Sequence, residues 1–354
     1  MKQIHLFFRK ARIRLLNWEY WSFNLVYFPV FFYWIWLSIK ARSFFFFSTS
    51  NPSIKNAGFT MESKKSIYDL LPNGTYPGTI LISAGTNMSN LSQILASNNM
   101  NFPLVAKPDI GERGTAVKKL SCVEEASTYL TGIKVDFLLQ EWCDYPMEAG
   151  IFYCRYPDAA KGFISGIVAK EFMSITGTGK NTVEELLLKE DRYVLQYEQL
   201  KKEQPETLKI ILPKGEARIL VPYGNHCRGT LFTDASYRIT PRLEEVFHQT
   251  CSQINGFYFG RLDIRFESWE LLEQGSHFSI IELNGAGSEP THIYDPSHSI
   301  WFAWKEIIRH LNILFRISKQ NKETFKTDYM SLHEGMRMLK EKKRYDALLS
   351  QHVP

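Results

Sequence analysis

Apolar and polar positions along the chain alternate between short strand-like runs and helical spacings, with no internal repeat. Apolar or period-two runs predict strands at 43–48, 79–82, 102–108, 137–141, 162–171, 217–222, 257–266 and 277–282. Apolar positions three to four residues apart predict helices at 61–71, 91–96, 123–130, 183–189, 241–254, and from 300 nearly to the end of the chain. Because the order is not an even βαβ rhythm, we expect an α+β protein with mixed sheets in more than one lobe.

The positive charge of the chain is concentrated at its beginning. The length of 354 residues is typical of two or three folded units. The composition, 44% hydrophobic and 22% charged, excludes a disordered protein. Five of the 42 basic residues lie within residues 1–14, which contain no acid, and the 37 that remain equal the number of acidic residues. A phosphate-tracking surface for nucleic acid is therefore not expected, since the body of the chain is neutral.

An aromatic segment follows this basic arm. Fifteen of the fifty aromatic residues lie within residues 18–47, and residues 20–39 carry no charge over a length that could cross a bilayer. A cleavable signal peptide is disfavoured, because the run ends in Ile39-Lys40-Ala41-Arg42 rather than a small-residue cleavage site. A spanning helix, a segment dipping into one leaflet and a helix packed on the protein remain open, and Pro29 favours a kink.

The cysteines predict neither a disulfide framework nor a zinc site. There are five, an odd number without the close spacing of zinc ligands, which is typical of reduced thiols in a cytosolic protein.

Two segments have the character of nucleotide-binding elements. Lys107 ends an apolar strand and precedes a loop that contains Gly111 and Gly114, which suits a polyphosphate because glycines let backbone N–H groups approach its oxygens. The strand ending in Gln140, Glu141 and Trp142, with Glu148 shortly after it, could read an adenine edge and ribose hydroxyls. The first segment alone is equally compatible with a strand-end lysine beside an ordinary glycine turn. The second alone is better explained as a strand that leaves the core with solvated acids.

A third pair of segments indicates a metal site. The alternating run Arg261-Leu262-Asp263-Ile264-Arg265 places Asp263 on one face with both arginines, and Ile280 to Asn284 likewise places Glu282 and Asn284 together. Two carboxylates and an amide oxygen suit Mg²⁺, and Gly285-Ala286-Gly287 lets another segment or a ligand approach closely. The alternative is a polar, solvated sheet face.

Taken in order, these motifs resemble the ATP-grasp superfamily, within its carboxylate–amine/thiol ligase branch, which includes D-alanine–D-alanine ligase, cyanophycin synthetase and glutamate-ligase-like domains. The matching pieces are Phe102 to Gly114, Leu139-Gln140-Glu141, Arg261-Leu262-Asp263 and Ile281 to Asn284, and the resemblance covers roughly residues 61–296. It implies two α+β lobes that grip ATP.

The resemblance also implies roles for individual residues. Phosphate-binding lysines would be Lys107 and Lys170, under a loop formed by Gly111, Arg113, Gly114 and Thr115. Gln140, Glu141 and Trp142 would flank adenine, Glu148 would bind ribose, and Arg228 would stabilise the transferred phosphoryl group. Magnesium, or manganese, would be held by Asp263, Glu282 and Asn284.

The sequence therefore predicts three parts: residues 1–60 with the basic arm, the aromatic segment and a remnant of an N-terminal lobe; an ATP-grasp domain at 61–299; and a helical extension at 300–354. The expected activity is ATP- and Mg-dependent activation of a carboxylate as an acyl phosphate for attack by an amine or thiol. A small-molecule kinase and a scaffold without turnover are the alternatives. We expect a cytoplasmic enzyme of small-molecule or lipid-linked substrates, with residues 1–47 as a contact to the inner face of the cell membrane, and no nucleic-acid partner. The sequence leaves the oligomeric state open.

Overall fold

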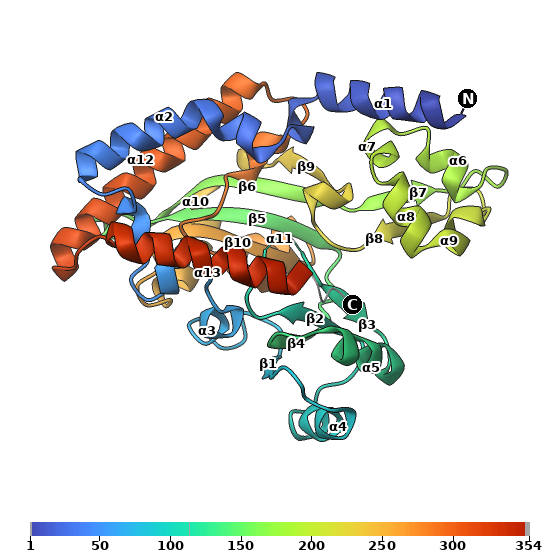
Figure 1. Cartoon of the computed structure of the whole chain (residues 1–354), viewed down its shortest axis with the longest axis horizontal. Coiled ribbons are helices and arrows are strands. Elements are labelled where there is room, and N and C mark those ends of the chain that lie inside the picture. The colour runs from blue at the N-terminus through green and yellow to red at the C-terminus, as the bar shows by residue number, and fades with distance from the viewer. Residues whose placement is uncertain (1, 113, 351–354) are drawn as a thin grey trace.

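The computed structural model describes residues 2–112 and 114–350 and contains three antiparallel sheets with helices around them (Figure 1). Arg113, expected in the glycine loop, lies outside the described residues. The predicted α+β class is confirmed, because every strand pairing between named strands is antiparallel.

The first sheet has the strand order β1-β4-β2-β3. Its strands are β1 (Thr79–Ile82), β4 (Phe137–Glu141), β2 (Leu104–Pro108) and β3 (Lys118–Leu120). Helices α4 (Met88–Ser97) and α5 (Val123–Gly132) bury Leu91, Ala126 and Tyr129 in the core of this lobe. Lys107 lies near the end of β2, one of the two central strands, as the sequence indicates.

The second sheet has the order β11-β10-β5-β6-β9. Its strands are β5 (Met147–Cys154), β6 (Phe163–Glu171), β9 (Leu231–Asp234), β10 (Phe259–Phe266) and β11 (Phe278–Asn284). Alternation along β5 divides its side chains between two cores. Ala149, Ile151 and Tyr153 share a core with α10 (Pro241–Ser252) and α11 (Trp269–Glu273), whereas Phe152 and Cys154 belong to a core with α12 (Ile300–Phe325).

A small unit lies beside the end of β6. It pairs β7 (Met173–Thr176) with β8 (Ala217–Val221) and contains the short helices α6 (Val183–Leu187), α7 (Asp191–Val194), α8 (Tyr197–Glu203) and α9 (Pro205–Lys209). A capping box starts α6, because the Thr182 side chain accepts from the Glu185 amide and Glu185 accepts from the Thr182 amide.

The basic arm and the aromatic segment form two helices, α1 (Lys2–Leu16) and α2 (Phe23–Ala41), joined by η1 (Trp18–Tyr20). Figure 1 shows both helices along one edge of the molecule, with α2 beside α12. Arg9 of α1 binds Asp191 of α7 at 2.6 Å, so part of the basic arm contacts the protein itself.

The prediction of a strand at 43–48, as a remnant of an N-terminal lobe, is wrong. Among the described residues this segment is a turn followed by the 3₁₀ helices η2 (Phe46–Thr49) and η3 (Lys55–Gly58). Phe45, Phe46 and Phe47 are buried because they pack in one core with α2 and α12, where the ring centres of Phe46 and Phe315 lie 5.6 Å apart. A buried apolar run has the same appearance in sequence whether a sheet or a helix covers it.

The helix predicted at 61–71 is shortened to α3 (Lys64–Tyr68). It starts there because the Ser63 side chain accepts a hydrogen bond from the Ser66 amide.

The final helix connects distant parts of the chain. Helix α13 (Leu332–Ser350) begins near Phe45, where a side chain on Gly335 would collide with the ring, and it ends with Leu349 in the core of the first lobe. Lys342 on this helix lies 3.4 Å from Glu112 of the glycine loop. The C-terminal helix therefore holds the first lobe against the rest of the protein.

Candidate nucleotide and metal site

Strands β10 and β11 bring the three metal-ligand candidates together. In their antiparallel register Asp263 pairs with Glu282 and Arg261 pairs with Asn284. Directly paired residues share a face of the sheet, so both carboxylates and the amide project to the same side. The Asn284 amide nitrogen lies 3.5 Å from Asp263, which brings the third candidate into contact with the first.

Asp263 is buried between two cations. The Arg261 guanidinium donates to both carboxylate oxygens, at 3.0 and 3.1 Å, and Lys170 Nζ lies 3.1 Å from Oδ1. Burial alone would raise the pKa of Asp263, but Arg261 and then Lys170 outweigh it and hold the pKa at about 2. The carboxylate is therefore an anion at any physiological pH.

Glu148, on the middle strand β5, lies beside Lys170 and Arg265. We call Glu148, Lys170, Arg261, Asp263 and Arg265 the cation–carboxylate cluster. Glu148 Oε1 accepts from Lys170 at 2.9 Å and Oε2 accepts from Arg265 at 3.1 Å, and both partners are direct neighbours of Glu148 in the register of β6 and β10. Although burial opposes the ammonium of Lys170, Asp263 and Glu148 raise its pKa above the ordinary value. Both oxygens of Glu148 are thus occupied by cations, and its expected contact with ribose stays a prediction.

A loop after β8 covers this cluster. A Cβ atom on Gly224 would lie 2.0 Å from Glu148 Oε1 and 2.6 Å from Lys170 Cδ, so only glycine permits the backbone to pass so closely. Arg265 donates to the Pro222 carbonyl at 2.9 Å, and Asn225 Nδ2 lies 3.1 Å from a Cβ placed on Gly114. The loop that starts at Pro222 therefore reaches from the cation–carboxylate cluster to the glycine loop of the first lobe.

Lys107 links the two lobes at this point. Its buried ammonium donates to Tyr68 Oη, Gln140 Oε1 and the Ile281 carbonyl at 2.8, 2.9 and 3.1 Å. Burial lowers the pKa of Lys107 to about 8, against an opposing effect of Glu282. Since Ile281 precedes Glu282, the lysine from the first sheet reaches the strand that carries a candidate metal ligand.

Two cations belong to the site although the sequence motifs gave them no role. Lys64, at the start of α3, donates to the Gly111 carbonyl and lies 3.8 Å from Glu282. Arg261 clamps Asp263, and its third nitrogen donates to the Glu289 carbonyl at 3.1 Å. The alternating pattern of β10 already predicted that Arg261 and Asp263 share a face of the strand. The sequence around Lys64 does not predict its contact with Glu282, which is more than two hundred residues away.

The remaining candidates have other partners, although the Trp142 ring centre also lies 5.6 Å from the Arg265 guanidinium. Arg228 binds Glu203 on α8 at 2.7 Å. Glu141 accepts from the Gly78 amide at 3.0 Å, and Trp142 lies under the ammonium of Lys119, 3.9 Å from the ring centre. Thr115 is exposed, next to Gly114 in the glycine loop. Their roles toward a nucleotide stay predictions.

The donor set fits a hard divalent cation such as Mg²⁺. Its three members supply carboxylate and amide oxygens, and the Glu282 side chain is 36% exposed, with only Lys64 as an ion-pair partner among the described residues. No group of three His, Cys, Asp or Glu suited to a metal occurs in the described chain, so the amide of Asn284 is needed to complete the set. Glu282 and Asn284 would bind such an ion, with Asp263 shared between it and the two cations.

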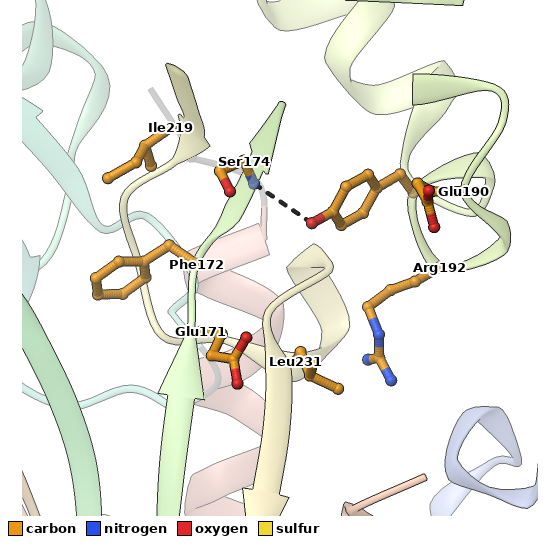
Figure 2. A pocket seen from close by; sticks show the side chains of 8 residues that line it. Glu171, Phe172, Ser174, Glu190, Arg192, Ile219 and Leu231 are labelled. Carbon is orange, nitrogen blue, oxygen red and sulfur yellow. Dashed lines mark hydrogen bonds between the residues drawn. The ribbon is translucent and has the colours of Figure 1, made fainter. Parts of the chain in front are cut away.

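A cavity of about 410 Å³ lies beside this cluster, between the ends of β6 to β9 and helix α7 (Figure 2). Glu171 lines it and follows Lys170 directly, so their side chains leave opposite faces of β6. Glu171 and Leu231 border it on the strand side, and Glu190 and Arg192 on the helix side. Phe172 also lines the cavity, and its ring centre lies 4.6 Å from the Arg265 guanidinium, so the cavity borders the cluster at this residue.

No protein-family model and no curated protein sequence matches the chain. Among solved structures it is similar to a D-alanine–D-alanine ligase from Bacillus anthracis, with 13% identity, a TM-score of 0.43, and coverage of 77% of this chain and 72% of that one. It is also similar to a D-Ala:D-Ser ligase from Enterococcus faecalis, with 12% identity, a TM-score of 0.41, and coverage of 76% of this chain and 63% of that one. A bifunctional glutathione synthetase from Pasteurella multocida has 14% identity and a TM-score of 0.38, with coverage of 71% of this chain and 35% of that one. The chain thus spans less than two thirds of the length of the last two proteins. These similarities are partial, and the side chains described above carry the functional interpretation.

Proposed function

We propose that the chain is an ATP- and Mg²⁺-dependent ligase that activates a carboxylate as an acyl phosphate for attack by an amine or thiol. The observation that carries the proposal is the meeting of Lys107 from the first sheet with the strand of Glu282 from the second, next to the Lys170–Asp263 pair. Cations suited to phosphates and oxygens suited to magnesium thereby border one region between two lobes.

Charge neutralisation and alignment are the work expected of these residues. Lys107 and Lys170 would bind phosphate oxygens from opposite lobes, and Lys170 would exchange part of its contact with Asp263 and Glu148 for the nucleotide. Arg261 is held in the cluster and is better placed than Arg228 to stabilise negative charge on a transferred phosphoryl group. Bound magnesium would neutralise phosphate charge and orient the group to be transferred.

The reaction balances without a covalent enzyme intermediate. A carboxylate oxygen attacks the γ-phosphorus of ATP and releases ADP, and an amine or thiol then attacks the acyl carbon and releases phosphate. An amine gives an amide and a thiol gives a thioester. The requirement for ATP places the reaction in the cytoplasm.

Hydroxylamine provides the test. With ATP, Mg²⁺ and a pool of cellular carboxylates, hydroxylamine should replace the natural nucleophile and give a hydroxamate together with ADP. A stable phosphorylated product and no hydroxamate would favour the kinase alternative. Nucleotide binding without ADP formation for any carboxylate would favour the scaffold, and both results would overturn the ligase proposal.

A further inference from the structure

The outer face of α1 and α2 is a large apolar surface that the proposed reaction does not use. Only 17% of the most apolar 18-residue stretch of α2 is buried, although the helix is long and apolar enough to cross a membrane. The exposed apolar side chains of the two helices are Ile4, Phe7, Phe8, Leu15, Leu16, Phe23, Leu25, Phe28, Phe31, Phe32, Ile35, Trp36 and Ile39. We call these side chains the aromatic face. Contiguous apolar surfaces of this kind mark contacts with a membrane or another protein.

The opposite side of α2 is attached to the body of the protein along the length of the helix. Val26 and Val30 share a core with Ala303 and Ile307 of α12, and Leu37 belongs to the core that contains Ile313. Two side-chain hydrogen bonds fix the same interface: Trp304 Nε1 donates to the Val26 carbonyl at 2.9 Å, and Tyr33 Oη donates to Asn312 at 2.6 Å. A helix bound in this way along α12 can lie in the plane of a membrane surface but cannot cross the bilayer without leaving the protein.

The junction between α1 and α2 is fixed as well. Glu19 of η1 is buried and binds Arg192 at 2.7 Å and His226 at 3.0 Å. Trp18 donates to the His298 carbonyl at 2.7 Å and stacks on Tyr294. Both helices are therefore held along the edge that Figure 1 shows, with their apolar side chains outward.

The positive charge around the aromatic face favours anionic lipid as its partner. Residues 1–61 contain eight Lys and Arg and a single acid, the buried Glu19. Arg12, Arg14, Lys40, Arg42 and, on α12, Lys305 are exposed. A second copy docking by the same face would bring like charges together, whereas anionic lipid headgroups complement them. The 72% exposed Trp301 near the start of α12 adds an aromatic ring of the type enriched at membrane interfaces.

We propose that the aromatic face binds an anionic phospholipid bilayer, with α1 and α2 lying in the plane of the interface and the catalytic lobes in the cytoplasm. The apolar side chains enter the headgroup–acyl boundary, and the exposed arginines and lysines contact lipid phosphates. This surface lies outside the cation–carboxylate cluster, so membrane binding and nucleotide chemistry can fail independently.

The test is flotation of the full chain with phosphatidylcholine vesicles, with or without phosphatidylglycerol. We expect binding to the mixed vesicles that weakens with added salt, and little binding to phosphatidylcholine alone. Phe28→Ser with Phe32→Ser should weaken binding by about 100-fold, and Arg12→Gln with Arg14→Gln by about 30-fold. Matched controls are Tyr237→Ser, an exposed aromatic beside α10, and Lys340→Gln with Lys343→Gln, two exposed lysines of α13; both should bind as the unaltered chain does.

Three outcomes would overturn the proposal. One is a chain that stays with the unbound fraction at every lipid composition. Another is binding that is equally strong on neutral vesicles and insensitive to the arginine changes. The third is a dimer in size-exclusion chromatography that the Phe28 and Phe32 changes dissolve, with no lipid binding by either form. Nucleotide binding measured on the same variants should be unchanged.

Discussion

The ammonium of Lys107 donates to the main-chain carbonyl of Ile281 at 3.1 Å, and this contact connects the first sheet to the strand that carries Glu282. The two residues are 174 positions apart in sequence. Their contact determines how close the proposed phosphate-binding lysine lies to the proposed metal ligand, and the first prediction follows from it.

Nucleotide affinity should depend on the charge of Lys107. Burial lowers the pKa of this residue to about 8, so the ammonium that a phosphate needs is present below that pH and is lost above it. We expect the affinity for ATP to fall as the pH rises from about 7 to about 9. Lys107→Met should weaken binding by about 10- to 100-fold at pH 7 and remove this pH dependence. Lys107→Arg should retain affinity for ATP above pH 8. Calorimetric titration measures the affinity at each pH, and the same pH profile for the unaltered chain and both variants would contradict the prediction.

Turnover should depend on Glu282 while folding does not. Its side chain is partly exposed and has one ion-pair partner among the described residues, so Glu282→Gln should leave the stability within about 0.5 kcal/mol of the unaltered chain. The loss of a metal ligand should nevertheless lower ADP formation by at least about 100-fold. Glu267→Gln is a matched control, because Glu267 is exposed just beyond the end of the neighbouring strand β10. Equal activity of the two variants would rule out the metal assignment.

Acid stability should report on Asp263. Its pKa is about 2 in the folded protein, below the value of about 3.9 in an unfolded chain, so its stabilising effect is complete above about pH 4 and is lost as the pH falls toward 2. Asp263→Asn should cost about 3–5 kcal/mol near neutral pH, because Arg261 and Lys170 would remain as buried, unpaired cations. The difference from the unaltered protein in urea unfolding should shrink between about pH 4 and 2. A constant difference across this range would show that Asp263 is not held by these partners, and Asp69→Asn, an exposed change of equal charge, serves as the control.

The glycines after β11 should contribute to the stability of the fold. Amides of Ala286 and Gly287 donate to the carbonyls of Ala57 and Gly58 at 2.9 and 3.0 Å, so this segment packs backbone to backbone. A Cβ on Gly285 would lie 2.4 Å from the Ala57 oxygen. Gly285→Ala should therefore lower the free energy of unfolding by about 1–3 kcal/mol or more. An unchanged melting temperature would contradict this packing.

Local patterns predicted the parts of the site that single strands determine. The alternation of residues 261–265 and 280–284 correctly placed Asp263 with Arg261, and Glu282 with Asn284, because side-chain direction in a strand is set by period two. The close approach expected at Gly285-Ala286-Gly287 is also found, and the partner there is the segment around Ala57.

The remainder depends on pairing between distant segments. Strand β5 was not predicted, although its second half, Ile151 to Cys154, is apolar and aromatic. Its first half contains Glu148 and Gly150 and no β-branched residue, and without β5 the positions of Lys170 and Arg265 beside Glu148 cannot be derived. Nor does sequence reveal that Arg228 binds Glu203, or that α12 rather than a strand buries the phenylalanines at 45–47. The burial of Glu148, Lys170, Asp263 and Arg265 depends on the register between strands.

The most direct measurement is equilibrium binding of a non-hydrolysable ATP analogue, with and without Mg²⁺, to the unaltered chain, Glu282→Gln and Lys107→Met. The proposal predicts that Mg²⁺ strengthens binding to the unaltered chain, that Glu282→Gln loses this gain but keeps metal-free binding, and that Lys107→Met binds weakly in both conditions. No binding by the unaltered chain, or equal binding by all three with no effect of Mg²⁺, would contradict a nucleotide site between these lobes.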